Sequence, residues 1–134
     1  MKSAHDMPFG AALTPDGVRF AIWAPSADGA EVEVDGRRVP MQRGAQGFFH
    51  CLDTEAAAGS RYAFRFEGLG VAVPDPASRF NPEGVHEPSE LVDASAYAWR
   101  DGEWRGRPFH DAVIYELHVG TFTPQGTYAA AAGR

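Results

Sequence analysis

The sequence is poor in cysteine, with Cys51 as the one thiol among 134 residues. A single cysteine excludes an internal disulfide, and Cys51 lies in an apolar alternating stretch, which predicts a buried free thiol. The five histidines show no metal-binding spacing, and no second cysteine is available to complete a zinc site. Glycine-rich phosphate loops and nucleophile elbows are also lacking. We therefore expect no bound metal ion and no cofactor.

Positive charge is scarce as well, because 12 Lys and Arg face 18 Asp and Glu, which gives a formal net charge of −6. Without a basic cluster the chain is a poor candidate for nucleic-acid binding, whereas neutral sugars remain open as partners. No apolar run approaches the length of a membrane-spanning helix. Residues 1–8 carry one lysine and no apolar run, so they do not form a signal peptide. A soluble cytoplasmic protein is expected.

Short alternating stretches separated by turn signals dominate the first half of the sequence. In residues 18–24, for example, Val18, Phe20 and Ile22 share one face of the expected strand. The spacing predicts about seven short strands, with turns roughly every 8–12 residues, as in an immunoglobulin-like β-sandwich. The expected strands are residues 9–13, 18–24, 30–34, 37–41, 48–52, 60–67 and 71–73.

Residues 74–111 show no period, and five prolines interrupt the segment. Several aromatic side chains within it offer apolar area to bury, which argues against disorder. A long irregular stretch of this kind is held by a neighbour. We interpret it as a connecting strap that lies over a further domain.

The segment Val113–Val119 (VIYELHV) has bulky side chains on both faces of an expected strand, as in a strand covered on both sides. Thr127 can then cap a helix that Tyr128 and the following alanines begin. A buried strand followed by a helix is the opening unit of a parallel α/β fold.

These motifs resemble the α-amylase family, glycoside hydrolase family 13, and within it the malto-oligosyltrehalose trehalohydrolases. YELHVGTFTPQGT (residues 115–127) is similar to the first barrel strand and following loop. FAIWAP (residues 20–25) is similar to the second strand of the N-terminal sandwich. PDPASRFNPEGVHEPSELVD (residues 74–93) and WRDGEWRG (residues 99–106) resemble the connector of the trehalohydrolases. The resemblance extends from about residue 9 to the end of the sequence.

The resemblance implies a fold class and three segments. Residues 1–73 would form an all-β sandwich of the early-set, carbohydrate-binding module family 48 type, and residues 74–111 the connector strap. Residues 112–134 would supply the first strand and the start of the first helix of a truncated (β/α)8 catalytic barrel.

The implied activity is hydrolysis of the α-1,4 bond next to the terminal trehalose unit of maltooligosyl trehalose, which releases trehalose. The implied partners are this substrate or a related α-glucan and the missing catalytic barrel. In this family the catalytic carboxylates lie on later barrel strands, beyond Arg134. We therefore carry no catalytic residue onto this sequence and expect the chain alone to be inactive.

Three side chains are candidates for sugar contact. Glu116 and His118 would face the same side of the first barrel strand, with His118 near the end where barrel active sites are built. The alternative is that both make structural hydrogen bonds to neighbouring strands. Trp104 in the strap could stack on a sugar ring or pack on the barrel, whereas Trp23 is assigned to packing within the sandwich.

Two other functions remain open. One is the N-terminal domain of a glycogen branching or debranching enzyme, although the connector and the loop after residue 119 favour the trehalohydrolases. The other is a stand-alone α-glucan-binding module, which would have no reason to keep a strand and helix start after the sandwich.

Overall fold

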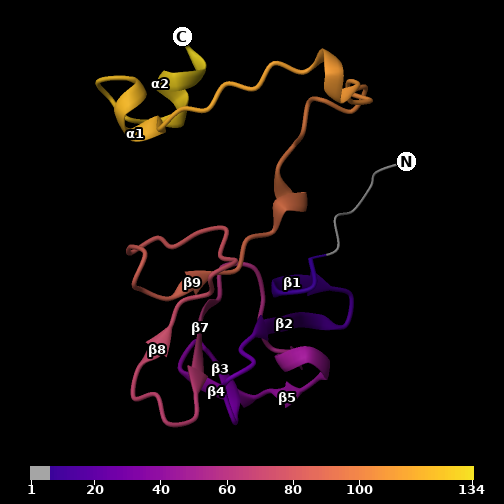
Figure 1. Ribbon diagram of the computed structural model, residues 1–134, viewed down its shortest axis with the longest axis vertical. Helices are drawn as coiled ribbons and strands as arrows, with labels where there is room; N and C mark the ends of the chain where they lie inside the picture. Colours follow the sequence, from indigo (N-terminus) through magenta and orange to yellow (C-terminus); the bar gives the residue numbers. More distant parts are fainter. Residues whose placement is uncertain (1–6) are drawn as a thin grey trace. The chain divides into compact units, whose positions relative to one another are not determined.

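The computed structural model describes residues 7–134 and separates into two compact units, one ending at Ala98 and one spanning Trp99–Arg134 (Figure 1). The strands of the first unit are β1 (Gly10–Thr14), β2 (Gly17–Trp23), β3 (Ala30–Val34), β4 (Arg37–Pro40), β5 (Gln42–Arg43), β6 (Phe48–Asp53), β7 (Arg61–Phe66), β8 (Ala72–Val73) and β9 (Ser89–Glu90). Its short 3-10 helices are η1 (Ala45–Gly47) and η2 (Ala94–Ala96). The second unit contains η3 (Phe109–Asp111), α1 (Val119–Phe122) and α2 (Tyr128–Ala132).

Two antiparallel sheets form the first unit, as the alternation of the sequence predicts. One sheet has the order β1-β2-β6-β5, and the other has the order β4-β3-β7-β8 with β9 also paired to β7. The inward faces of both sheets contribute to one apolar core, so the unit is a β-sandwich. Val18, Phe20 and Ile22 are buried on the inward face of β2, which confirms the predicted face.

Aromatic side chains fill the centre of the sandwich. Phe20, Phe49 and Phe64 are fully buried, and each such side chain contributes about 1.5–3 kcal/mol through the area it removes from water. The ring of Tyr62 contacts Phe20 and Phe64, with centroid distances of 5.1 and 6.1 Å and tilted or edge-on geometry. The thiol of Cys51 is half-buried rather than fully buried; burial and, secondarily, the negative charge of Asp53 raise its pKa to about 11.

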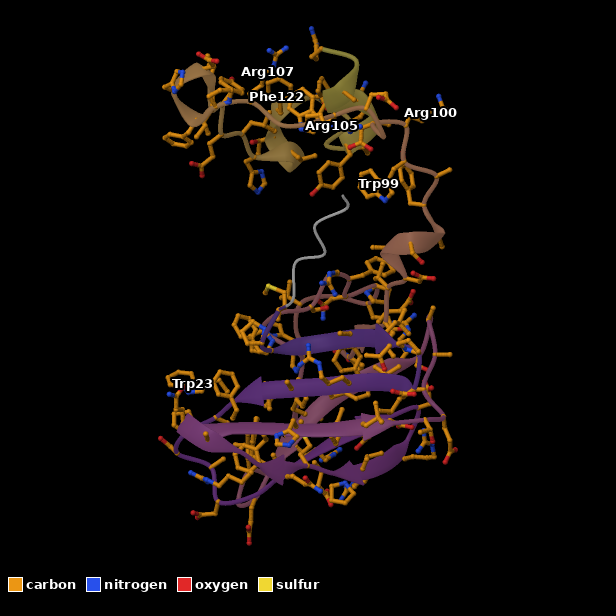
Figure 2. The ribbon with its side chains drawn as sticks, turned by 90° about the vertical axis from the view of Figure 1, so that its right-hand side faces the viewer. Trp23, Trp99, Arg100, Arg105, Arg107 and Phe122 are labelled. Atoms are coloured by element: carbon orange, nitrogen blue, oxygen red, sulfur yellow. The ribbon has the colours of Figure 1, made fainter. Side chains whose placement is uncertain are left out.

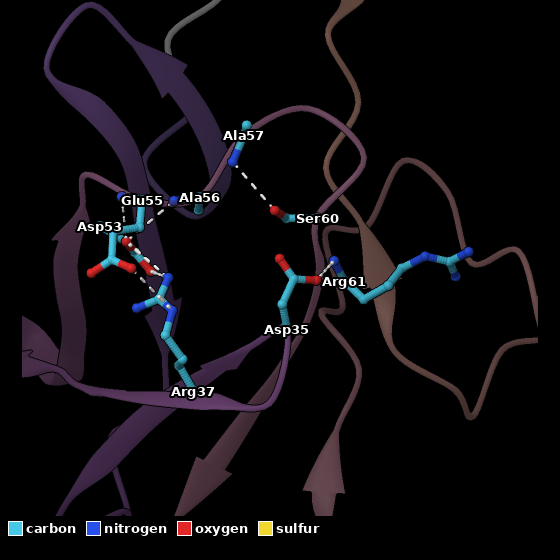
Figure 3. Close-up of polar contacts among 8 residues, drawn as sticks. All are labelled: Asp35, Arg37, Asp53, Glu55, Ala56, Ala57, Ser60 and Arg61. Carbon is cyan, nitrogen blue, oxygen red and sulfur yellow. Dashed lines mark hydrogen bonds and ion pairs between the residues drawn. The ribbon is translucent and has the colours of Figure 1, made fainter.

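One carboxylate ties the end of β6 in one sheet to β4 in the other (Figure 3). Asp53 Oδ2 accepts a hydrogen bond from Arg37 Nη2 at 3.0 Å, and Asp53 Oδ1 accepts from the backbone N–H of Glu55 at 2.8 Å. A further bond comes from the N–H of Ala56 at 3.3 Å. Because the side chain of Asp53 is only 3% exposed, these partners replace the water that the carboxylate loses on folding.

The predicted hairpin between β3 and β4 is confirmed. Asp35 and Gly36 both have positive φ, 48° and 81°, as a two-residue turn between antiparallel strands requires. The side chain of Asp35 accepts a hydrogen bond from the N–H of Arg61 at 2.9 Å, which fixes the turn to β7 (Figure 3).

The first half of the connector packs on the sandwich itself, which differs from the expectation that the whole strap lies over a further domain. The buried Tyr62 hydroxyl donates to Asp75 Oδ2 at 2.8 Å, and the Asp75 N–H donates to Ser89 Oγ at 3.1 Å. Ser89 pairs with Tyr62 across β9 and β7, and Leu91 belongs to the core. The segment has no period because its polar groups are satisfied by side chains and by one short strand. The boundaries at residues 73/74 and 111/112 remain predictions.

The segment Val113–Val119 forms no strand in this chain, and its place as the first strand of a barrel stays a prediction. Residues 113–118 form no strand, and α1 begins at Val119. Val113, Ile114 and Tyr115 are 75–96% exposed. A parallel strand acquires its hydrogen bonds only from neighbouring strands, and the described residues provide none here. The predicted helix start is confirmed, because Thr127 Oγ1 accepts from the N–H of Ala130 at 3.2 Å and α2 follows.

No helix in residues 7–134 is both long enough and apolar enough to cross a membrane.

Candidate functional site

An open pocket of about 600 Å³ lies where β3, β4 and β7 meet the turn after β7. It is lined by Gly29, Ala30, Glu31, Arg38, Pro40, Met41, Arg65, Phe66, Glu67, Leu69 and Gly70. The order β4-β3-β7 brings Arg38 and Arg65 to the two sides of Glu31 and Glu33, because strand pairing places these positions opposite one another. Apolar groups and charged groups therefore share one concave surface.

Ion pairs order the polar side of this pocket. Arg65 Nε lies 2.5 Å from Glu33 Oε2, and Arg38 approaches Glu33 and Glu31 at 3.8 and 3.9 Å. All four side chains are partly exposed, so these pairs stabilise the fold little. Their effect is to hold several N–H donors and carboxylate acceptors in fixed positions at the pocket, where they can bond a neutral ligand rich in hydroxyl groups.

The chemistry of a glycosidase needs a carboxyl group with a raised pKa to protonate the leaving oxygen. Burial raises the pKa of Asp75, although hydrogen bonds from the Ala77 N–H and the Tyr62 hydroxyl and the charge of Arg79 oppose this effect. Asp75 is 5% exposed, and Tyr62 and Ala77 occupy its two oxygens at 2.8 Å each. A substrate oxygen has no access to it, so this carboxyl group is structural.

A second surface surrounds Trp23 at the end of β2 (Figure 2). Trp23 is 59% exposed, so the expectation that it packs within the sandwich is wrong. The alternation of side chains along β2 indicates this exposure, because Trp23 shares its face with Arg19 and not with the buried Phe20. The indole Nε1 donates to the backbone oxygen of Gln46 at 2.9 Å, which fixes the orientation of the ring.

The three side chains predicted as sugar contacts all lie in the second unit and are exposed. His118 precedes α1, and its Nδ1 lies 3.4 Å from Thr121 Oγ1. Glu116 lies in the extended segment before it, and Trp104 is 62% exposed. Within residues 99–134, no hydrogen bond, ion pair or ring contact joins these three side chains to one another. Their role in sugar binding stays a prediction.

Known proteins resemble the chain in sequence and in structure. The carbohydrate-binding module 48 family (isoamylase N-terminal domain) matches residues 8–78. Malto-oligosyltrehalose trehalohydrolases from Rhizobium sp. (strain M-11) and Deinococcus radiodurans are 41% and 43% identical, each over 87% of this chain. The chain spans about a fifth of the length of these relatives, 20% and 19% respectively.

Solved structures of other proteins also resemble the chain. A protein from Salmonella typhimurium, described as an α-amylase, matches 96% of this chain and 22% of its own with a TM-score of 0.82 and 37% identity. A mutant pullulanase from Paenibacillus barengoltzii, complexed with maltotriose, matches 83% of this chain and 19% of its own with a TM-score of 0.60 and 30% identity. Sequence, strand order and structural likeness agree, and the chain belongs to the carbohydrate-binding module 48 family, the isoamylase N-terminal domains.

Proposed function

We propose that this chain is the N-terminal, glucan-binding part of a glycoside hydrolase that releases trehalose from maltooligosyl trehalose. The observation that carries the proposal is the identity of about 40% with trehalohydrolases over most of the chain, including the connector. The whole enzyme would hydrolyse the α-1,4 bond next to the terminal trehalose unit and act in the cytoplasm. Its catalytic barrel is the partner of the sandwich, and neither metal nor cofactor enters the proposal.

Within this function the sandwich supplies binding, and the chemistry belongs to the barrel. A retaining glycosidase needs two carboxyl groups about 5–5.5 Å apart on either side of the scissile bond. Of the two carboxylates that line the pocket, Glu31 is paired with Arg38 and Glu67 follows β7, whereas the buried Asp75 is inaccessible. Uncharged hydroxyl groups of an α-glucan suit the fixed donors and acceptors of the pocket, and Leu69 and Phe66 add apolar area.

The chain alone is expected to release no trehalose from maltooligosyl trehalose. In this proposal the acid and nucleophile of the reaction belong to the barrel, and the buried Asp75 of the sandwich is closed to substrate. Trehalose formation would be measured by chromatography after incubation with highly purified chain. Turnover that copurifies with the chain and persists through a second purification would place catalysis in the sandwich. It would contradict the proposal that the barrel carries the catalytic residues.

Weak binding of maltoheptaose to the pocket is the second expectation. The pocket offers no exposed aromatic ring for stacking, so a dissociation constant in the millimolar range is expected, about −4 kcal/mol. Arg65→Ala should weaken binding about fivefold or more, because it removes charge-assisted donors. Binding would be followed by NMR titration of the full chain.

Arg61→Ala is the matched control for this titration. Arg61 lies on the same strand, four positions away, and also forms ion pairs, but with Glu83 and Glu90 outside the pocket. Its loss should leave the affinity unchanged. Equal weakening by both substitutions would show a general effect on the fold and remove the pocket from the proposal. Micromolar binding that is lost on Trp104→Ala would instead favour a stand-alone binding module.

A further inference from the structure

The outer faces of the two sheets differ in charge. The outer face of β3, β4 and β7 carries the ion pairs of Glu31, Glu33, Arg38 and Arg65 and is a solvated polar surface. The outward positions of β2 and β6 hold no carboxylate, although the chain is acidic overall. These positions are Arg19, Ala21, Trp23, Phe48, His50 and Leu52. An exposed aromatic ring on a face without carboxylates is not explained by solvation or by the core.

The loops on both sides hold the indole of Trp23 in place. Its Nε1 donates to Gln46 at 2.9 Å, and the adjacent Ala24 N–H donates to the oxygen of Gly47 at 2.9 Å. The guanidinium of Arg43 donates to the backbone oxygens of Pro25, at 3.0 Å, and Ala27. The ring is therefore oriented before any ligand arrives, which lowers the entropy lost on binding.

A hollow of about 310 Å³ lies on the same outer face, lined by Pro8, Arg19, Ala21, Phe48 and His50, of which Phe48 is paired in register with Trp23. Strand register pairs Trp23 with Phe48 and Ala21 with His50. The small side chain of Ala21 therefore leaves space beside Phe48 and His50. The volume lies at the lower end of the range of small-molecule sites, about 300–1,000 Å³. The lining of the hollow thus combines the apolar side chains of Pro8, Ala21 and Phe48 with the polar side chains of Arg19 and His50.

We propose that Trp23 and this hollow form a second contact surface for an α-glucan, on the outer face of the sheet that does not carry the pocket. The C–H face of a pyranose ring would stack on the exposed indole, since Trp presents an apolar face with a polar edge. His50 and Gln42, which are paired in register, place hydrogen-bonding groups on the same face. This chemistry fits neutral hydroxyl groups. The inference rests on the proposed glucan-binding function and adds a site to it.

Two glucan surfaces on opposite faces have a consequence for affinity. A short oligosaccharide engages one surface at a time, so each contact stays weak. A long or branched glucan can engage both, and the second contact then benefits from a high effective concentration. The sandwich would hold large glucans more tightly than the separate sites suggest.

The test is an NMR titration of the full, isotopically labelled chain with maltoheptaose. The indole N–H signal of Trp23 and the backbone amide of His50 should shift in proportion to occupancy. Trp23→Ala should abolish the shift at His50 while the shifts at Arg65 and Leu69 of the pocket persist. Tyr97→Ala is the control, because Tyr97 is an exposed aromatic residue of the first unit that lines neither surface, 64% exposed against 59% for Trp23, and it should leave all four positions unchanged.

Each other outcome has a defined meaning. Shifts confined to Arg65 and Leu69 would overturn the second surface and leave the proposed function standing, whereas no shifts at either surface up to about 10 mM would overturn both. Shifts at Trp23 that depend on protein concentration without sugar would assign this face to a second copy of the chain and overturn the inference. If Trp23→Ala does not fold, Trp23→Phe and His50→Ala replace it, and each should weaken binding at this face about threefold or more.

Discussion

Replacing Gly47 with alanine is expected to lower the free energy of unfolding by about 2–5 kcal/mol. Gly47 has φ +82°, a conformation that costs an alanine about 1–2 kcal/mol. The added Cβ would also lie 2.5 Å from Pro25 Cα and 2.6 Å from Pro25 Cβ. Because the close atoms belong to the backbone and the rigid ring of Pro25, the loops that contain Pro25 and Gly47 must move apart, at a further cost of about 1–3 kcal/mol.

Gly36→Ala separates these two contributions. Gly36 has nearly the same φ, +81°, but no atom lies within 4 Å of the position where its Cβ would be. It should lose only the conformational term, about 1–2 kcal/mol. Chemical denaturation of both variants measures the difference, which reports the contact with Pro25 alone. Equal losses of unfolding free energy in the two variants would mean that the loops at Pro25 and Gly47 accommodate a methyl group. The orientation of Trp23 would then not be fixed by close packing of these loops.

Asp53→Asn is expected to lower the free energy of unfolding by about 1.5–3 kcal/mol at neutral pH. Burial acts to raise the pKa of Asp53, but hydrogen bonds from the Glu55 N–H, Arg37 and the Ala56 N–H outweigh it and hold the pKa below 3.8. The amide keeps the shape of the carboxylate but removes the charge that Arg37 bonds. Arg37 is 40% exposed, so solvent screening places the loss toward the lower end.

The effect should depend on pH with a definite sign. A carboxyl group whose pKa is lower in the folded chain than in the unfolded chain stabilises the fold above the unfolded value. That stabilisation is lost as the pH falls below about 3.8 and through the pKa of the folded state. Melting temperatures of wild type and Asp53→Asn should therefore converge in acid. A constant difference down to the lowest accessible pH would contradict an electrostatic origin.

Asp93→Asn provides the comparison for the same chemical change. Side-chain and backbone hydrogen bonds from Ser95 lower the pKa of Asp93 as well, but its charge lies at the surface, at the start of η2. Water can replace the lost partner there, so the melting temperature should change little. A loss as large as that of Asp53→Asn would show that burial is not what distinguishes the two carboxylates.

Much of the sandwich follows from local sequence. Alternation of side chains located β1 to β4 and β6 to β8 to within one or two residues but missed the two-residue β5, and the Asp35–Gly36 turn followed from the need for positive φ. The pairing of β9 with β7 could not be predicted this way, because two residues carry no period and their partners lie far away in the sequence. The absence of a strand at Val113–Val119 has a related cause, since its pattern specifies a strand only where neighbouring strands are present.

The candidate surfaces were harder to predict than the strands. The pocket depends on the register that places Arg38 and Arg65 beside Glu33, and register is not contained in any one strand. Glu116 and His118 were predicted from their shared face on an expected barrel strand, and Trp104 from its aromatic ring. All three lie in the second unit, where no described contact joins them to one another.

The complete burial of Ser89 determines how far the rigid part of the chain extends. Its Oγ accepts from the backbone of Asp75 and from Asn81, and the Leu91 N–H bonds Ser60. Rotation of the backbone within this stretch would break several buried hydrogen bonds at once, each costing about 1–3 kcal/mol. Val92 and the residues up to Ala98 are largely exposed, so hydrogen bonds such as that from the Ser95 N–H to Asp93 compete with water. The buried hydrogen bonds therefore extend the rigid body beyond the strands of the two sheets and through the first half of the connector, as far as Leu91.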